Sequence, residues 1–91
     1  MRERPIRFVY PTSRFKRSFR KLPPRIQKLA IKKDEVFRRN AFDSRLKTHK
    51  LKGKLQDFYS YWVSDEYRIV FEFVKGDTVI YHDIGTHEIY R

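Results

Sequence analysis

The 91-residue sequence contains no cysteine, and this absence excludes two kinds of stabilisation. Without thiols the chain forms neither disulfides nor thiolate metal sites, a composition compatible with a reducing compartment. Glycine is scarce as well, and the three glycines lie too far apart for a glycine-rich phosphate loop. No run approaches the roughly 20 apolar residues of a membrane span, and the opening MRERPIRFVYP lacks the apolar stretch of a signal peptide. We therefore expect a cytoplasmic protein with one domain, residues 1–91, and a small core.

Acidic residues are also few, at 11 against 22 lysines and arginines, which gives a net charge of +11. The imbalance is confined to one part of the chain: residues 1–55 hold 19 basic and 4 acidic residues (+15), and residues 56–91 hold 3 and 7 (−4). This sorting predicts a surface in the N-terminal half that binds a polyanion, with nucleic acid as the leading candidate. An acidic protein partner fits the same charge. A basic membrane-surface helix is disfavoured, because the helical segments carry apolar stripes that a small core needs.

The first half of the chain predicts one strand and two helices. Residues 6–10 favour a strand closed by Pro11, and Thr12 or Ser13 can cap a helix whose apolar positions recur with a helical period. Pro23 and Pro24 end this helix and permit a new one, which runs to about Asn40. The two helices should form an antiparallel hairpin.

The second half predicts a three-stranded meander after a basic loop at 41–56. Residues 58–63, 68–74 and 78–84 are rich in aromatic and β-branched side chains and are separated by short turns. In the middle strand, Ile69, Phe71 and Phe73 share the face that should meet the helices, so Arg68 belongs to the opposite, less covered face. The order predicts an α+β fold with the helical hairpin on one face of a mostly antiparallel sheet.

Three histidines are the first candidates for chemistry. His49, in the basic loop, is either a solvated side chain or a base, and His82, in the middle of a strand, reads as a hydrogen-bonded structural residue. His87 follows Gly85 and Thr86, where a turn would aim its ring over the open sheet face, and a structural role is as well supported as a functional one. A metal site formed by His82, Asp83 and His87 matches no established ligand spacing.

What remains is a basic surface with proton-transfer candidates His49, Glu66, His87 and Tyr90, and with Arg68 as a fixed cation. RNA cleavage requires little more. A base deprotonates the 2′-OH, cations stabilise the charged phosphorane, and an acid protonates the leaving 5′ oxygen. DNA has no 2′-OH and would be spared.

These residues resemble a known family. The H-x-L-x-G loop (His49 to Gly53), the Y-R-I-V-F strand (Tyr67 to Phe71) and the G-T-H near the end (Gly85 to His87) resemble the RelE/ParE superfamily of type II toxins, in particular RelE-type mRNA interferases. The resemblance covers nearly the whole chain. It implies an RelE-like α+β fold and an endoribonuclease that cleaves mRNA in the ribosomal A site without a cofactor. It also implies a cognate antitoxin as partner.

The resemblance assigns roles residue by residue. His49 resembles a loop histidine that transfers protons, Arg68 the arginine at the scissile phosphate, and His87 the near-terminal general acid. Glu66 stands where some members carry an acidic residue, and Tyr90 lies near a terminal aromatic that stacks on a base. Trp62 stands where other members have a histidine. The basic residues expected to contact RNA are Lys16, Arg17, Arg20, Lys21, Lys32, Lys33, Lys47, Lys50, Lys52 and Lys54.

Two other interpretations share the fold. ParE-type toxins poison DNA gyrase and are not nucleases, and a non-catalytic RNA- or ribosome-binding module would carry its histidines incidentally. The joint presence of His49, Arg68 and His87 favours the nuclease.

Overall fold

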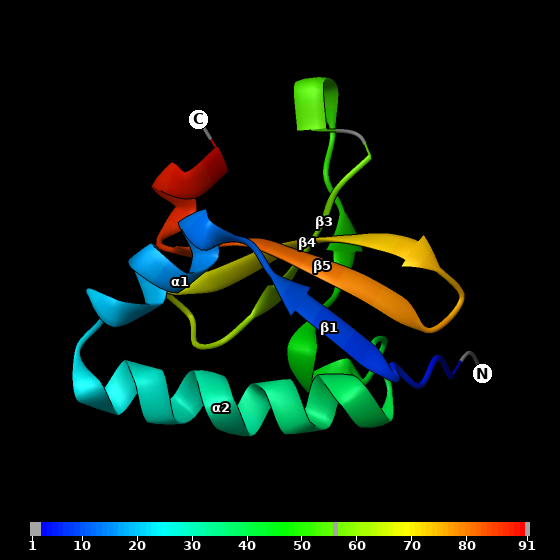
Figure 1. The fold of residues 1–91 in the computed structure, drawn as a ribbon, viewed down its shortest axis with the longest axis horizontal. Coiled ribbons are helices and arrows are strands. Elements are labelled where there is room, and N and C mark those ends of the chain that lie inside the picture. Colours follow the sequence, from blue (N-terminus) through cyan, green and yellow to red (C-terminus); the bar gives the residue numbers. More distant parts are fainter. Residues whose placement is uncertain (1–2, 56, 91) are drawn as a thin grey trace.

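The computed structural model describes residues 3–55 and 57–90, so Gln56, at the end of the predicted basic loop, and Arg91 lie outside it. Its strands and helices follow the predicted order, and short 3-10 turns lie between and after the later strands (Figure 1). The elements are β1 (Phe8–Pro11), α1 (Ser13–Arg20), α2 (Pro24–Arg39), η1 (Ser44–Leu46), β2 (His49–Lys50), η2 (Gly53–Leu55), β3 (Tyr59–Trp62), β4 (Arg68–Lys75), β5 (Thr78–Gly85) and η3 (His87–Tyr90). No helix in the described part of the chain is long and apolar enough to cross a membrane.

The predicted meander is confirmed as β3, β4 and β5, but the sheet has five strands in the order β1-β5-β4-β3-β2. The first strand pairs in parallel with β5, so the sheet is mixed. At the other edge, β2 pairs antiparallel with β3 and places His49 opposite Ser60. The prediction missed β2 because two residues are too few to show any alternation of apolar and polar side chains.

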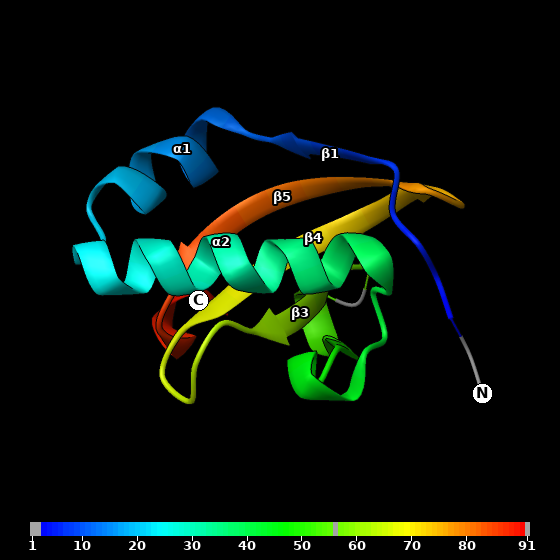
Figure 2. The ribbon, with the colours of Figure 1, turned by 90° about the horizontal axis from the view of Figure 1, so that it is seen from below.

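The two helices begin where the sequence predicts. The Oγ1 of Thr12 accepts a hydrogen bond from the backbone N–H of Phe15 (3.0 Å), and α2 starts at Pro24 after a Pro23 that cannot continue α1. The helices run in opposite directions, and α2 lies across one face of the sheet (Figure 2). The α+β class and the placement of the helices on the sheet are confirmed.

The core lies between α2 and the sheet, with the fully buried Phe37 at its centre. The Phe37 ring lies 4.8 Å, centroid to centroid, from each of the Tyr61 and Phe71 rings. Ile69 and Phe71 are buried on this face as predicted, and Phe73 packs against the same cluster.

The opposite face of the sheet is more buried than the sequence predicted. Val70 alternates with Ile69 and Phe71 and so points away from the helices, yet only 4% of its surface is exposed. The turns η2 and η3 rise on this side of the sheet and account for its burial (Figure 1). A register shift also makes His82 an extra residue on β5, because Val70 pairs with Asp83 and Phe71 pairs with Tyr81. We call this side, away from α2, the open face.

Candidate functional site

Arg68 is the first residue of β4 and pairs with Trp62 on one side and Gly85 on the other. Its Nη1 donates hydrogen bonds to the carbonyl oxygens of Ser64 (2.7 Å) and Tyr67 (3.2 Å). Its Cζ lies 3.9 Å from the centroid of the Trp62 ring. Because two carbonyls and an aromatic ring hold the guanidinium, its charge occupies a defined position on the open face.

The turn between β3 and β4 presents Glu66 beside this arginine. The Ser64 Oγ accepts hydrogen bonds from the backbone N–H groups of Glu66 (3.2 Å) and Tyr67 (3.1 Å), which fixes the turn. Glu66 itself is exposed. The turn therefore holds a carboxylate next to the start of β4.

Glu66, Arg68 and His87 line one hollow of about 330 Å³, together with Asp65 and Thr86. His87 enters this hollow because η3 follows β5 directly, and Gly85 at the end of β5 is the partner of Arg68. Three of the five predicted catalytic residues, two of them titratable side chains and one a fixed cation, thus come together. We call this the Arg68 hollow.

Tyr90 and His49 lie apart from the Arg68 hollow. The Tyr90 hydroxyl is 2.6 Å from the Ser60 hydroxyl on β3, and Tyr90 lines a second hollow of about 380 Å³ with Lys52 and Lys54. His49 is exposed on β2, opposite Ser60, with its Nδ1 3.0 Å from the carbonyl oxygen of Lys47. From His49 to β4 there are two strand spacings, about 10 Å.

Trp62, to which the sequence assigned no role, lies at the centre of a cationic cluster. The Lys47 Nζ is 4.1 Å from the Trp62 ring centroid, so Lys47 and Arg68 both contact the indole. Lys47 has a left-handed backbone (φ 53°), a conformation that is costly for a residue with a side chain and that occurs often at functional sites. The signal that could have found the contact between Trp62 and Arg68 is the tight turn, because the two residues flank it and therefore face each other.

The predicted RNA-contacting residues divide between the two sides of the sheet. Lys32 and Lys33 belong to α2, on the side away from the open face. Lys47, Lys52 and Lys54 contact or line the features just described on the open face. The remaining residues are exposed, on α1 (Lys16, Arg17, Arg20), after it (Lys21) and on β2 (Lys50).

Carboxylates and imidazoles do not gather into a metal site in the described chain: among residues 3–55 and 57–90 no three histidine, aspartate or glutamate side chains come together as ligands. His82 instead pairs with Glu72, Nε2 to Oε1 at 2.8 Å, as the sequence predicted for a structural histidine.

Comparison with known proteins gives a match by structure and none by sequence. No family model and no curated protein matches the chain. A chain of the toxin–antitoxin complex RelBE2 from Mycobacterium tuberculosis superposes with a TM-score of 0.76 at 20% identity, over 94% of this chain and 95% of that one. The YoeB/ParE toxin from Agrobacterium tumefaciens gives 0.74 at 16% identity, over 89% and 99%. The chain has the RelE/ParE toxin fold.

A third structure with this fold is a chain of the archaeal RelE–RelB complex from Pyrococcus horikoshii, with a TM-score of 0.68 at 16% identity, over 94% and 96% of the two chains. The RelE/ParE fold predicted from the sequence motifs is therefore confirmed. It carries the Arg68 hollow at the end of β5, where η3 turns back over the open face.

Proposed function

We propose that this protein is the toxin of a type II toxin–antitoxin system, an endoribonuclease that cleaves mRNA in the ribosomal A site without a metal ion. The observation that supports this function is the Arg68 hollow, where an oriented guanidinium lies beside a carboxylate and an imidazole. Cleavage through attack by the 2′-OH requires such groups: a base, an acid and a fixed cation.

Different residues of the open face carry out the separate steps of the reaction. Arg68 stabilises the charge that develops on the scissile phosphate, and Glu66 or His49 removes the 2′-OH proton. His87 protonates the leaving 5′ oxygen, so the products are a 2′,3′-cyclic phosphate and a 5′-hydroxyl. Tyr90 contacts a neighbouring base.

Binding relies on the basic half of the chain. Lys47, Lys50, Lys52 and Lys54 follow the RNA backbone near the site. The residues that contact ribosomal RNA in this proposal are Lys16, Arg17, Arg20, Lys21, Lys32 and Lys33. Each phosphate contact releases counterions, so affinity falls as salt rises.

A cognate antitoxin neutralises the toxin in this proposal. Of the similar structures, RelBE2 is a toxin–antitoxin complex and the archaeal one is a complex of RelE with RelB. Acidic antitoxin residues would meet the +15 half, with the antitoxin bound as an extended or helical segment.

The test maps new 5′ ends on a defined mRNA incubated with purified protein, with and without ribosomes stalled at a known codon. Cuts that require the ribosome and disappear in the Arg68→Ala, His87→Ala double variant are the expected result. An active double variant would refute the catalytic assignment and support a non-catalytic module. Growth arrest without any RNA cleavage would favour gyrase as target, which a DNA supercoiling assay would then detect.

A further inference from the structure

A third hollow, of about 300 Å³, lies on the open face next to the Arg68 hollow. Its apolar walls are Leu55, Phe58, Val70 and Ile89. The Phe58 ring stacks on His82, with centroids 4.6 Å apart and planes at 16°. An apolar hollow with an aromatic wall and a few polar groups is the usual form of a site for a small planar ligand.

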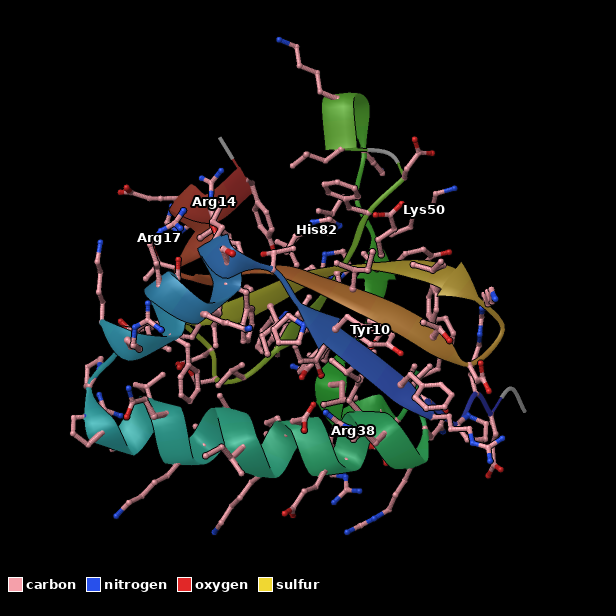
Figure 3. The ribbon with its side chains drawn as sticks, viewed as in Figure 1. Tyr10, Arg14, Arg17, Arg38, Lys50 and His82 are labelled. Carbon is pink, nitrogen blue, oxygen red and sulfur yellow. The ribbon has the colours of Figure 1, made fainter. Side chains whose placement is uncertain are left out.

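The charges of this hollow are arranged opposite to those of a phosphate site. Its floor carries Asp83, whose side chain is only 12% exposed, and His82 is hydrogen-bonded to a second carboxylate, that of Glu72. The cation is at the rim: Arg14, which lies on α1 (Figure 3), has 70% of its side chain exposed, and it forms an ion pair with Asp83. The carboxylate in the floor repels a phosphate, and the arginine at the rim attracts one. The hollow therefore suits an uncharged group, with any phosphate outside at the rim.

The Asp83 carboxylate can accept one further hydrogen bond. Its Oδ1 accepts hydrogen bonds from the Ser18 hydroxyl (2.6 Å) and from the backbone N–H of Ile84 (2.9 Å). In the described chain its Oδ2 is engaged by the Arg14 Nε alone, at 3.2 Å. A carboxylate oxygen accepts two hydrogen bonds, so Oδ2 can accept a second from a ligand.

The hollow is adjacent to the residues proposed to cleave RNA. Val70, in its wall, lies two residues after Arg68 on the same face of β4, about 7 Å along the strand. Ile89, in its wall, belongs to the same turn as His87 and Tyr90. A nucleotide whose base occupies this hollow is therefore a neighbour of the one whose phosphate contacts Arg68.

We propose that this hollow binds one nucleobase of the RNA strand and selects bases whose exocyclic amino group donates to Asp83. Cytosine N4, adenine N6 and guanine N2 present such a donor, and uracil presents only carbonyl oxygens outside its ring, which the carboxylate repels. The ring lies against Phe58, and its phosphates lie at the rim near Arg14. This inference rests on the proposed function, because RNA is taken as the substrate.

The test measures binding separately from cleavage. Calorimetry with 2′-O-methyl tetranucleotides of cytosine, adenine and uracil uses ligands that lack the attacking hydroxyl and stay intact. The cytosine and adenine strands should bind at least about fivefold more tightly than the uracil strand. Phe58→Ala should weaken all three by about tenfold through lost stacking. Asp83→Asn, whose amide also donates, should remove the preference against uracil, with circular dichroism to verify the fold.

Lys28→Ala is the matched control, because Lys28 is exposed on α2, on the other side of the sheet, and should leave all three affinities unchanged. Equal affinities for the three strands, in a protein that still cleaves mRNA, would overturn the inference and leave the proposed function intact. Base selection in a protein that cleaves no mRNA would support the pocket and refute the nuclease. If Phe58→Ala weakens only the binding of an antitoxin protein, the hollow is a protein-binding site and the inference is wrong.

Discussion

The guanidinium carbon of Arg68 lies 3.9 Å from the centroid of the Trp62 ring, across the turn that joins β3 to β4. The same arginine donates to the carbonyl oxygen of Ser64 at 2.7 Å, inside that turn. Ring and carbonyl together restrict a long side chain that would otherwise sample many rotamers. A cation held in place before substrate arrives costs no reorganisation when charge develops on the phosphate.

Replacing Trp62 should therefore reduce cleavage through Arg68. We expect Trp62→Ala to lower the single-turnover rate by about 3- to 30-fold, the range of a cation–π contact, and Trp62→Phe to retain most of the activity. The NMR signal of the Arg68 Nε–H should also lose its ring-current shift in Trp62→Ala. Tyr10→Ala is the matched control, since Tyr10 is an aromatic residue exposed on β1. An unchanged Arg68 signal would show that the indole does not orient the guanidinium.

Removing the two central groups of the Arg68 hollow should abolish the proposed cleavage without unfolding the protein. Arg68→Ala should lower the rate by about 100- to 1000-fold, as loss of one stabilising donor does. His87→Ala should lower it by about 100- to 10,000-fold. Both side chains lie at the surface of the hollow rather than in the core, so urea denaturation midpoints should change little. Arg25→Ala, exposed on α2, should behave as wild type. Full activity in either single variant would remove that residue from the mechanism.

Local patterns predicted most of the fold. Proline positions, the Thr12 cap and the alternation of Ile69, Phe71 and Phe73 depend on neighbours in sequence, and the structure confirms them. The pairing of β1 with β5 and the burial of Val70 depend on segments far away in the chain, so no local period records them.

The site shows the same division. Glu66, Arg68 and His87 could be expected together because the start of β4 and the end of β5 lie at the same end of the meander. The contact of Lys47 with Trp62 could not, because it depends on a left-handed residue in a loop without periodicity. His82 was predicted to be hydrogen-bonded, but its stacking on Phe58 joins two segments that are distant in the sequence, so no local pattern records it.

Gly85 should be essential for the position of η3. A Cβ at this residue would lie 2.7 Å from the Cγ2 of Ile89, well inside van der Waals contact. We expect Gly85→Ala to displace η3, and with it His87, and to lower the cleavage rate at least about tenfold. Adding Ile89→Ala removes the clash, so the double variant should regain part of the rate relative to Gly85→Ala. If the second substitution lowers the rate further, steric displacement is not the cause.

The buried tyrosine pair should make the protein unstable in alkali. Tyr81 donates a hydrogen bond to Asp34 (2.7 Å), so the Tyr61 hydroxyl, 2.8 Å away, donates to Tyr81. Burial raises the pKa of Tyr61 and of Tyr81 well above the ordinary value. The unfolded chain therefore loses these protons first as pH rises above about 10. The free energy of unfolding should be constant with respect to both groups below that pH and should then fall by about 1.4 kcal/mol per pH unit for each tyrosine.

Urea denaturation between pH 8 and 11.5 measures this slope, and Tyr61→Phe should remove one tyrosine's share of it. A slope that Tyr61→Phe leaves unchanged would mean that the Tyr61 hydroxyl ionises without unfolding the core.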